Sequence, residues 1–219
     1  MTVQTSQVFF VSGIDTSIGK TYATGYLAKL WNAQGIATIT QKLIQTGNVD
    51  ISEDIEQHRQ IMGTGWLDVD IEKLTMPEIF SYPASPHLAT KLDGREIDFG
   101  KIEAATQQLM QKFDRVLLEG AGGLMVPLNE KLLTLDYVAM QKFPVILVSS
   151  GRLGSINHTL LSLEALKAKN IELYALAYNL HDESQDPLIS NSTADYLKQY
   201  LTTHFPHAQW LEIPIIESL

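Results

Sequence analysis

A glycine-bounded segment near the start of the chain has the residue types of a phosphate-binding loop. Residues Gly13–Thr21 have the sequence GIDTSIGKT and lie between an apolar run that predicts a strand and a stretch that predicts a helix. In that context backbone N–H groups bind phosphate oxygens, Lys20 adds a positive charge at the outer phosphates, and the Thr21 hydroxyl is placed to ligate Mg²⁺. Five residues, not the usual four, separate Gly13 from Gly19. The generic pattern therefore leaves a chance Gly-Lys-Thr turn open.

Two carboxylates and a second lysine are placed to complete such a site. Glu119 ends a predicted strand, and the glycines that follow it let backbone approach a ligand closely. Lys42 ends another predicted strand, with Asp54 downstream. Oxygen ligands suit Mg²⁺, so Thr21, Asp54 and Glu119 form a candidate metal set. Lys42 would concentrate positive charge where a phosphoryl group or a carboxylate sits. Each residue alone is more often a surface residue, but their shared position at strand ends favours a site.

An asparagine after the fifth predicted strand bears on base recognition. Asn179 begins the sequence Asn-Leu-His-Asp, whereas a guanine-binding motif has Asn-Lys-x-Asp. Leu180 and His181 therefore make guanine specificity unlikely, and the Asn179 amide suits the edge of an adenine. A turn-forming asparagine is nearly as good an interpretation of the local sequence.

Apolar runs alternate with amphipathic stretches along the chain, which predicts an α/β fold with a doubly wound, mostly parallel sheet flanked by helices. In such folds ligands bind at the carboxyl ends of the strands. We expect one P-loop domain over residues 1–219. Predicted strands cover Val8–Ser12, Ile36–Thr40, Arg115–Glu119, Val145–Ser149, Leu173–Asn179 and Leu211–Ile215. Predicted helices cover Gly19–Gln34, Glu53–Met62, Ile97–Lys112, Thr134–Gln141, Ser155–Lys169 and Ser192–His204, and the proline-containing stretch Gly63–Gly94 is expected to be irregular.

Composition excludes several functional classes. The net charge of −9 argues against broad binding to nucleic acid or to an anionic membrane, because both need a basic face. The chain has no cysteine, which excludes disulfides and thiolate–metal sites. The segment Met1–Gln7 has no cationic leader pattern, and no apolar run approaches the length of a membrane span. We therefore expect a cytoplasmic protein that acts on small molecules.

Taken together, these motifs resemble one family closely, the ATP-dependent dethiobiotin synthetases of biotin biosynthesis. The five-residue glycine spacing is that family's own form, and the likeness extends over most of the chain. It is carried by Gly13-x-Asp15-Thr16-x-x-Gly19-Lys20-Thr21, Lys42, Thr46-Gly47, Asp54, Ser85-Pro86-His87, Glu119-Gly120-Ala121-Gly122-Gly123, Pro127-Leu128, Pro144-Val145-Ile146-Leu147-Val148, Leu153-Gly154-x-Ile156-Asn157-His158, Asn179 and Glu212-Ile213-Pro214.

The resemblance implies that 7,8-diaminopelargonate, CO₂ and ATP give dethiobiotin through a carbamate and a carbamic–phosphoric anhydride, with Mg²⁺ held by Thr21, Asp54 and Glu119. It implies catalytic roles for Lys42, Lys20 and Thr16. It places ATP against Ser17, Ile18, Gly19, Lys20, Thr21, Tyr22, Asp54, Glu119, Gly120, Ala121, Gly122, Asn179, Leu180, Ile213, Pro214 and Ile215. It places the diamine against Thr16, Lys42, Thr46, Gly122, Leu153, Gly154, Ile156 and Asn157.

The family also implies a homodimer whose substrate site lies near the subunit boundary. The start of the predicted Ser155 helix matches the part that receives the substrate's carboxylate tail from the neighbouring subunit. Three departures from the family pattern stand out. Ser17 replaces a glutamate found in some relatives, and Leu43 replaces a common proline. Because the chain ends at Leu219, we also expect a more open adenine pocket.

Two rival classes share this fold and its phosphate chemistry. P-loop switch proteins resembling partition ATPases usually carry an additional lysine early in the loop, and Ile14–Ile18 contain none. Amidotransferase-type cobyrinate or cobyrate synthetases need a nucleophilic cysteine in a glutaminase domain, and this chain has none. The switch ATPase is the remaining alternative.

Overall fold

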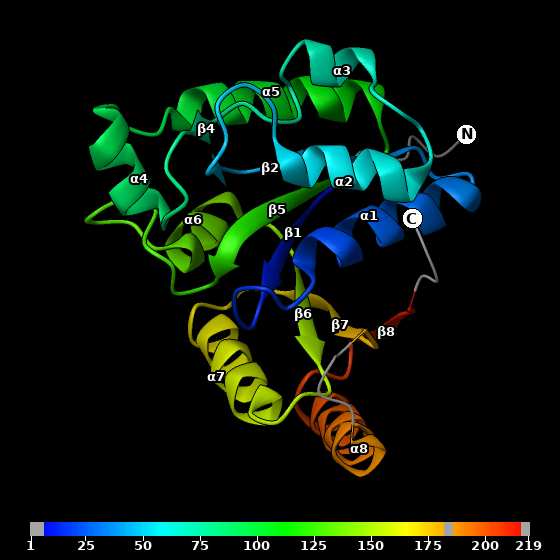
Figure 1. The fold of residues 1–219 in the computed structure, drawn as a ribbon. Coiled ribbons are helices and arrows are strands. Elements are labelled where there is room, and N and C mark those ends of the chain that lie inside the picture. Colours follow the sequence, from blue (N-terminus) through cyan, green and yellow to red (C-terminus); the bar gives the residue numbers. More distant parts are fainter. Residues whose placement is uncertain (1–6, 182–185, 216–219) are drawn as a thin grey trace.

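Six strands form one parallel sheet at the centre of the molecule, in the order β2-β5-β1-β6-β7-β8 (Figure 1). The structure, a computed structural model, describes residues 7–181 and 186–215. All pairings between the named strands are parallel, including that of a separate two-stranded pair, β3 with β4, whereas the isolated bridge between Pro127 and Leu133 is antiparallel. The strands are β1 (Gln7–Gly13), β2 (Thr38–Lys42), β3 (Gln45–Thr46), β4 (Ile79–Phe80), β5 (Arg115–Gly123), β6 (Val145–Ser150), β7 (Leu173–Asn179) and β8 (Gln209–Ile213).

Helices cover both faces of the sheet, as the doubly wound prediction requires (Figure 1). Helix α1 packs on one face with α2 beside it, and α5, α6, α7 and α8 contribute to the core of the other. Among the described residues, no helix combines the length and the apolar character needed to cross a bilayer. The helices are α1 (Lys20–Ala33), α2 (Glu53–Met62), α3 (Asp68–Ile71), α4 (Pro86–Asp93), α5 (Phe99–Lys112), α6 (Thr134–Gln141), α7 (Ser155–Ala168) and α8 (Pro187–His204).

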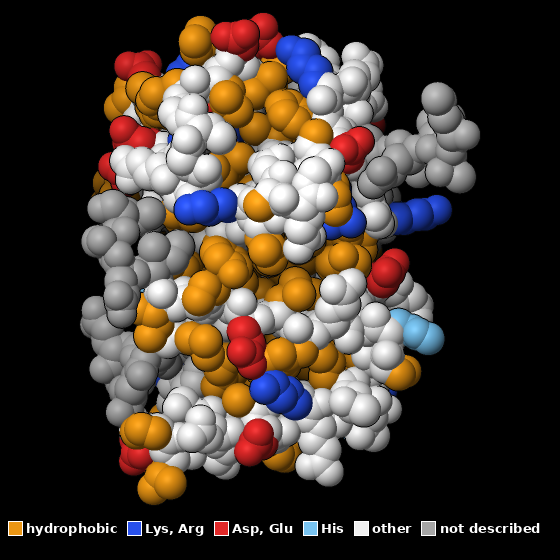
Figure 2. Space-filling model, turned by 90° about the vertical axis from the view of Figure 1, so that its right-hand side faces the viewer, with side chains coloured by type: hydrophobic (Ala, Val, Ile, Leu, Met, Phe, Trp, Pro, Cys, Tyr) orange, Lys and Arg blue, Asp and Glu red, His pale blue; other side chains and the backbone are white. Residues whose placement is uncertain are grey.

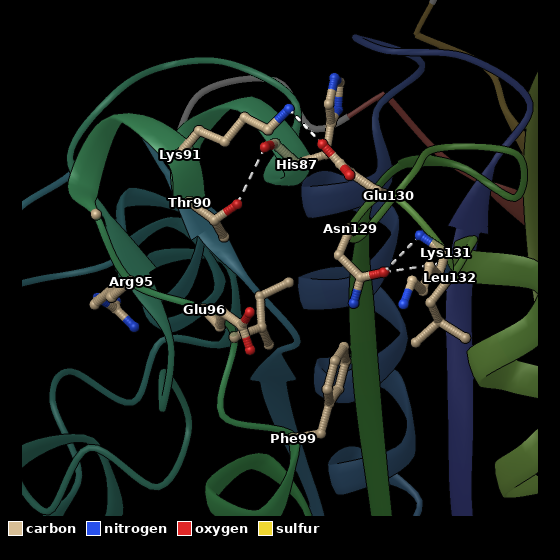
Figure 3. Close-up of a pocket in the computed structure, with 12 residues that line it drawn as sticks. His87, Thr90, Lys91, Arg95, Glu96, Phe99, Asn129, Glu130, Lys131 and Leu132 are labelled. Atoms are coloured by element: carbon tan, nitrogen blue, oxygen red, sulfur yellow. Dashed lines mark hydrogen bonds and ion pairs between the residues drawn. The ribbon is translucent and has the colours of Figure 1, made fainter.

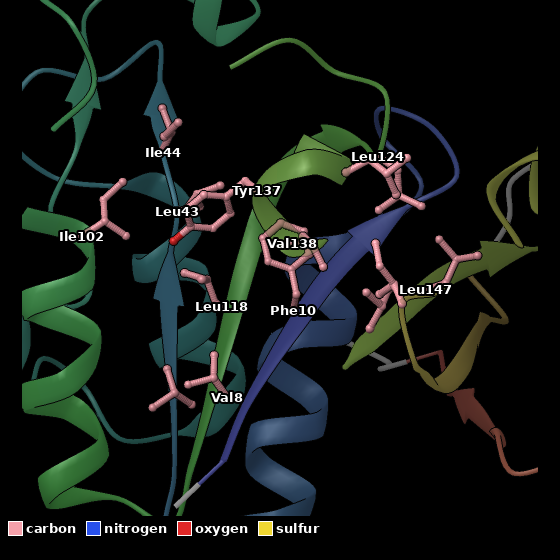
Figure 4. Packing of buried hydrophobic residues seen from close by; sticks show 14 of the residues in the cluster. Val8, Phe10, Leu43, Ile44, Ile102, Leu118, Leu124, Tyr137, Val138 and Leu147 are labelled. Carbon is pink, nitrogen blue, oxygen red and sulfur yellow. The ribbon is translucent and has the colours of Figure 1, made fainter. Parts of the chain in front are cut away.

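The alternation of side chains along β1 explains why this strand is apolar on both faces. Val8 and Phe10 belong to the core under α5, α6, α7 and α8, part of which is seen in Figure 4. Phe9 and Val11 point into the core under α1. Successive side chains of a strand point to opposite faces, so a strand with helices on both sides reads as a continuous hydrophobic run.

The fold confirms the predicted class, but two stretches differ from the prediction. Gly63–Gly94 is not irregular throughout, because it contains α3, β4 and α4. Helix α4 has Pro86 in its first turn, where proline is tolerated, and ends at Asp93, followed by Gly94 as C-cap with φ of 65°. Helix α8 begins five residues before Ser192, because the Asp186 side chain accepts a 2.9 Å hydrogen bond from Leu188 N and caps it.

Three strands also have bounds that differ from the prediction by two residues or more. Strand β5 was predicted to end at Glu119 but continues to Gly123. Strand β2 begins at Thr38 and not at Ile36, because the Asn32 side chain satisfies both Thr38 backbone groups, with hydrogen bonds of 2.8 and 2.9 Å. Strand β8 spans Gln209–Ile213, two residues earlier than predicted. The predicted features of residues 1–6 and of Asp182 lie outside the described residues.

Parallel pairing gathers the predicted site residues at one edge of the sheet. The carboxyl ends of β1, β2 and β7 carry the phosphate loop, Lys42 and Asn179, and Glu119 lies beside them within β5. In the sheet register Lys42 is paired with Glu119, and Glu119 is paired in turn with Val11 of β1. The arrangement therefore brings together side chains that are far apart in the sequence, as expected at the carboxyl edge of a parallel sheet.

Candidate active site

The phosphate loop is closed by its glycines and by one buried side chain. Ile18 is 2% exposed and packs against Gly13, where an added Cβ would come within 2.6 Å of Ile18 Cγ2. Ser17 and Gly19 both have positive φ, of 57° and 89°. Gly19 directly precedes α1, so the loop leads into a helix N-terminus, where free N–H groups favour an anion. The geometry supports phosphate binding and disfavours the chance-turn interpretation.

A buried cluster of opposite charges lies beside the loop. Lys42 Nζ is 2.8 Å from Glu119 Oε1, forms a second ion pair with Asp54, and donates to Gly120 O at 3.3 Å. Thr21 Oγ1 donates to Asp54 Oδ1 at 3.0 Å and to Glu119 Oε1 at 3.2 Å. Four of the predicted site residues therefore touch one another directly, although they come from β2, α1, α2 and β5.

Charge–charge attraction outweighs burial in this cluster. Burial favours the neutral acid, but Lys42 and a hydrogen bond from His58 hold the pKa of Glu119 well below its usual range. Burial also opposes the charge of Lys42, yet Glu119 and Asp54 raise its pKa above the ordinary value. Lys20 differs, because burial, opposed by Glu119 and reinforced by Lys42, lowers its pKa. The Lys20 ammonium donates to Asp15 O at 3.2 Å.

The oxygen atoms of this cluster suit a divalent cation. Thr21, Asp54 and Glu119 bring one hydroxyl and two carboxylates within hydrogen-bond distance, and the Lys42 ammonium already sits between the carboxylates as a cation. Hard oxygen donors of this kind fit Mg²⁺, which is usually bound by one or two carboxylates together with substrate phosphates. The described residues contain no group of three or more histidine, cysteine, aspartate or glutamate side chains that could hold a metal ion. Any metal here would therefore depend on the nucleotide for further ligands.

The predicted adenine side is attached to the phosphate loop by Asn179. Its Nδ2 donates to Ile18 O at 3.1 Å, and its Oδ1 accepts from His181 N at 3.0 Å. Leu180 N donates to Ile213 O at 3.0 Å, which joins the ends of β7 and β8. Pro214 and Ile215 follow directly, and Ile215 is 51% exposed. The predicted effect of the chain end on the adenine pocket concerns residues 216–219, outside the described part of the chain.

A hollow of about 440 Å³, the α7 hollow, is lined by loop residues 14–16, by the segment 123–126 and by residues of α7. Thr16 lines it, and a Cβ added to Gly122 would lie 3.9 Å from Thr16 Oγ1. Asp15 closes one side: its Oδ2 accepts from Arg152 at 2.7 Å, and its Oδ1 accepts from Thr16 N at 2.7 Å. The structure therefore groups Thr16 and Gly122, both predicted on the substrate side.

The start of α7 presents the remaining predicted substrate residues. Gly154 is the N-cap of α7, with φ of 95°, and Leu153 before it is 84% exposed. Asn157 is exposed and Ile156 half-buried on the first turn of the helix. Thr46 lies apart from these, on β3, where it is paired with Phe80 of β4. Tyr22 is half-buried in the first turn of α1.

Comparison with known proteins identifies the family. Residues 7–214 match a family model described as an AAA domain. The chain is 52% identical over 202 residues to the ATP-dependent dethiobiotin synthetase BioD 2 of Pasteurella multocida, covering 92% of this chain and 94% of that protein. It is 50% identical to the protein of the same description in Haemophilus ducreyi, covering 94% and 97%. The chain belongs to the ATP-dependent dethiobiotin synthetase family.

Solved structures support the fold of this dethiobiotin synthetase family member. A ParA family ATPase from Chlorobium tepidum superposes with a TM-score of 0.53 at 12% identity, covering 97% of this chain and 86% of that one. The signal recognition particle receptor FtsY from Elizabethkingia anophelis gives a TM-score of 0.52 at 15% identity, covering 96% of this chain but 60% of that one. At such low identity the likeness confirms the P-loop fold alone, so it does not favour the switch ATPase.

A larger hollow, the α4 groove, lies largely outside this family's motifs. It measures about 890 Å³ and is bounded by α4 and the segment 129–132 (Figure 3). Lys91 of α4 forms an ion pair of 2.6 Å with Glu130, and Asn129 Oδ1 accepts from two backbone N–H groups of its own loop. Of the family motifs, only His87 contributes to its lining. The size of a hollow alone therefore does not identify the active site, because the larger α4 groove is mostly lined by residues outside the family motifs.

Sequence reasoning missed two residues that complete the site. His58 donates toward Glu119, and Arg152 forms an ion pair with Asp15 of the loop. His58 follows Asp54 by four residues in a helix that the sequence predicted, so the spacing places both on one face. Arg152 had no comparable signal, because its partner is 137 residues away. The departure at Leu43 is also explained: its N–H donates to Glu119 O at 2.8 Å, which a proline could not do.

Proposed function

We propose that this chain is an ATP-dependent dethiobiotin synthetase, a cyclo-ligase that converts 7,8-diaminopelargonate, CO₂ and ATP into dethiobiotin, ADP and phosphate. The observation that carries the proposal is the direct contact of Lys42 with Asp54 and Glu119 beside a phosphate loop, in a chain of this family. That contact places the Lys42 ammonium and two carboxylates in one buried cluster beside the phosphate loop. Residues 1–219 would act as a single P-loop domain.

The loop residues would bind the triphosphate. Backbone N–H groups from Ser17 to Thr21 surround the phosphates, and the Lys20 ammonium neutralises the outer ones. Mg²⁺ held by Thr21, Asp54 and Glu119 would neutralise charge on the β- and γ-phosphates. Tyr22 and the backbone of the residues from Gly120 to Gly122 would lie along the nucleotide.

The chemistry would proceed in three steps. One amine of the diamine adds to CO₂ and loses a proton, giving a carbamate. A carbamate oxygen attacks the γ-phosphorus of ATP as the bond to the bridging oxygen breaks, giving a carbamic–phosphoric anhydride and ADP. The second amine attacks the carbamate carbon, phosphate leaves and the amine loses a proton, which closes the cyclic urea.

Two lysines would position and stabilise these anions. Lys42 lies at the end of β2 and Lys20 at the start of α1, so both ammonium groups reach the same edge of the sheet. Between them they would hold the carbamate against the γ-phosphate and stabilise charge as it moves to the leaving groups. Thr16 would orient the carbamate end of the diamine from the loop.

The remaining residues would bind the two ends of the substrates. The diamine would pass Thr16 and Gly122 at the α7 hollow, with Thr46 of β3 as a further contact outside the hollow. Its carboxylate tail would meet the exposed N–H groups at the start of α7, around Leu153, Gly154, Ile156 and Asn157. The adenine would lie against Asn179, Leu180, Ile213, Pro214 and Ile215, with Asn179 also supporting the loop.

Exposed apolar side chains around the α7 hollow support a homodimer. Met125, Leu153 and Leu161 are 62%, 84% and 63% exposed, and Met125 and Leu161 line the hollow itself. Apolar side chains gathered on one face of a protein favour association. A second copy covering this face would place its α7 start near the substrate, so the substrate site would lie at the subunit boundary.

The surface charge fits small-molecule substrates in the cytoplasm. On the face shown in Figure 2, Lys and Arg side chains are dispersed among hydrophobic and uncharged surface. With a net charge of −9, the protein has little positive charge to attract nucleic acid or anionic membranes. The anionic substrates would instead meet the local positive charge of Lys20 and Lys42.

The function is tested by product formation. The purified chain is incubated with Mg-ATP, bicarbonate and 7,8-diaminopelargonate, and dethiobiotin is measured by mass spectrometry. We expect one dethiobiotin per ATP consumed, with ADP release dependent on the diamine. Absence of dethiobiotin, together with ATP turnover that is indifferent to the diamine, would contradict the proposal and favour a switch ATPase.

A further inference from the structure

A buried histidine lies behind the acidic residue of the active site. His58 belongs to α2 and is completely buried, with 0% of its surface exposed. Its Nε2 lies 2.9 Å from Glu119 Oε2. The other ring nitrogen, Nδ1, makes no hydrogen bond within the described part of the chain. The imidazole therefore has one polar partner, and that partner is the carboxylate at the centre of the proposed metal set.

The two oxygens of Glu119 have different partners. Oε1 accepts from Lys42 Nζ at 2.8 Å and from Thr21 Oγ1 at 3.2 Å, so it faces the phosphate loop. Oε2 faces His58. An ionised carboxylate can only accept hydrogen bonds, so the hydrogen in this contact belongs to Nε2 of the imidazole. His58 thus fixes one oxygen of Glu119 and leaves the other turned toward the loop.

Helix packing holds the imidazole in this place. Gly25 of α1 lies against α2, where an added Cβ would come within 3.0 Å of Ile61 Cδ1 and 3.3 Å of His58 Cα. The absence of a side chain at Gly25 therefore lets α2 approach α1 closely. Asp54, one helical turn before His58, is placed on the loop side by the same packing. The spacing of four residues on one helix sets both contacts with the cluster.

From this geometry we infer that His58 is a positioning residue that orients Glu119 for Mg²⁺ binding, without touching the substrate. The inference rests on the metal set of the proposed function. Partners behind a metal ligand fix its orientation, and their loss commonly weakens metal binding by about tenfold to a hundredfold. Without the His58 hydrogen bond, the Glu119 carboxylate is free to rotate and to divide its oxygens differently between Lys42 and the loop.

Variants with side chains of matched length distinguish a positioning role of His58 from a packing role. His58→Gln keeps an N–H donor at the same number of bonds from Cα as Nε2, whereas His58→Met has similar length and no donor. Ile61→Val is the control, because Ile61 is a buried apolar residue of the same helix and the change removes only one methyl group. Mn²⁺ binding is measured by electron paramagnetic resonance in the presence of a non-hydrolysable ATP analogue, and folding is checked by thermal unfolding.

We expect His58→Met to weaken Mn²⁺ binding about tenfold or more, while His58→Gln and Ile61→Val stay close to the wild type. The Mg²⁺ concentration for half-maximal dethiobiotin formation should shift in the same order. Equal Mn²⁺ binding by the Gln and Met variants would overturn the inference. If His58→Met does not fold, His58→Asn takes its place, because its amide is too short to reach Glu119. If the wild type makes dethiobiotin without binding Mn²⁺ or Mg²⁺, the proposed metal set of Thr21, Asp54 and Glu119 is itself wrong.

Discussion

The ammonium of Lys42 lies 2.8 Å from Oε1 of Glu119, with which Lys42 is paired in the sheet register. It is also ion-paired with Asp54, so one lysine bridges two carboxylates. The same lysine is required on the substrate side by the proposed chemistry. Under the proposed function, Mg²⁺ held by Asp54 and Glu119 would neutralise these carboxylates, so the Lys42 ammonium would be free to turn toward the carbamate.

Lys42→Ala should abolish dethiobiotin formation, or reduce it by at least about a hundredfold, because the carbamate loses its main stabilising charge. The protein should still fold, since Mg²⁺ remains able to neutralise Asp54 and Glu119. Product formation and circular dichroism measure these outcomes. Lys29→Ala, which removes an exposed lysine from α1, is the control and should leave turnover unchanged. Near-normal turnover by Lys42→Ala would remove this residue from the mechanism.

Gly19→Ala should weaken ATP binding by at least about tenfold, or 1.4 kcal/mol. An added Cβ would lie 2.3 Å from Asn179 Nδ2, so the asparagine that supports the loop would be displaced. Gly35→Ala is a matched control, because Gly35 has a similar φ of 81° but no atoms within 4 Å of the added Cβ. Titration calorimetry with a non-hydrolysable ATP analogue compares the two variants. Equal affinities would show that the contact between Gly19 and Asn179 does not shape the loop.

Much of the fold was predictable because its signals are local. The buried strand at β7 and the helices α2 and α6 match their predicted bounds, since period and end signals agree there. Short elements escaped prediction: β3 and β4 have two residues each, and their pairing depends on contacts across the chain. Helix α4 was hidden by prolines, although Pro86 stands in its first turn.

The site was predictable to the extent that strand ends and glycines mark it. Lys42, Thr21, Asp54 and Glu119 were each assigned from such positions, and the structure brings them into contact. The role of Asn179 in holding Ile18 could not be predicted, because 161 residues separate them. Nor does any sequence pattern show that an ammonium occupies the space between two carboxylates. Such features depend on three-dimensional packing of several elements.

Acid should destabilise the protein through a second buried pair, Arg59 with Asp70. The guanidinium donates to both Asp70 oxygens at 2.8 Å, and the two residues are 2% and 1% exposed. Burial opposes ionisation, but hydrogen bonds and charge from Arg59, together with Thr75, hold the pKa of Asp70 below its usual value. A lowered folded-state pKa stabilises the protein above the unfolded value of about 3.9. That stabilisation is lost as pH falls through the folded-state pKa.

Asp70→Asn should therefore cost about 3–5 kcal/mol near pH 7, because it leaves the Arg59 charge buried and unpaired. The difference from the wild type should begin to shrink below about pH 4, where Asp70 of the unfolded chain takes up a proton, and should go on shrinking as pH falls through the lowered folded-state pKa. Urea unfolding at pH 7 and near pH 3.5 measures both values. Glu130→Gln, which removes an exposed ion pair with Lys91, is the control and should leave the midpoints almost unchanged. If the difference in unfolding free energy between the wild type and Asp70→Asn did not depend on pH, the link between the Asp70 pKa and stability would be wrong.

Leu161→Asp should disrupt the proposed homodimer and, with it, diamine binding. Leu161 is 63% exposed on α7 and lines the α7 hollow, so a carboxylate there would be desolvated if a second copy covered it. We expect the dimer dissociation constant to rise by at least about a hundredfold, or 2.7 kcal/mol. The KM for the diamine should rise more than the KM for ATP, because the phosphate loop lies within one subunit. Sedimentation velocity and initial rates measure these changes.

The control is Ile71→Asp on α3, which is 72% exposed and lies at the opposite end of the molecule from α7 (Figure 1). If both variants sediment like the wild type, the subunit boundary lies elsewhere.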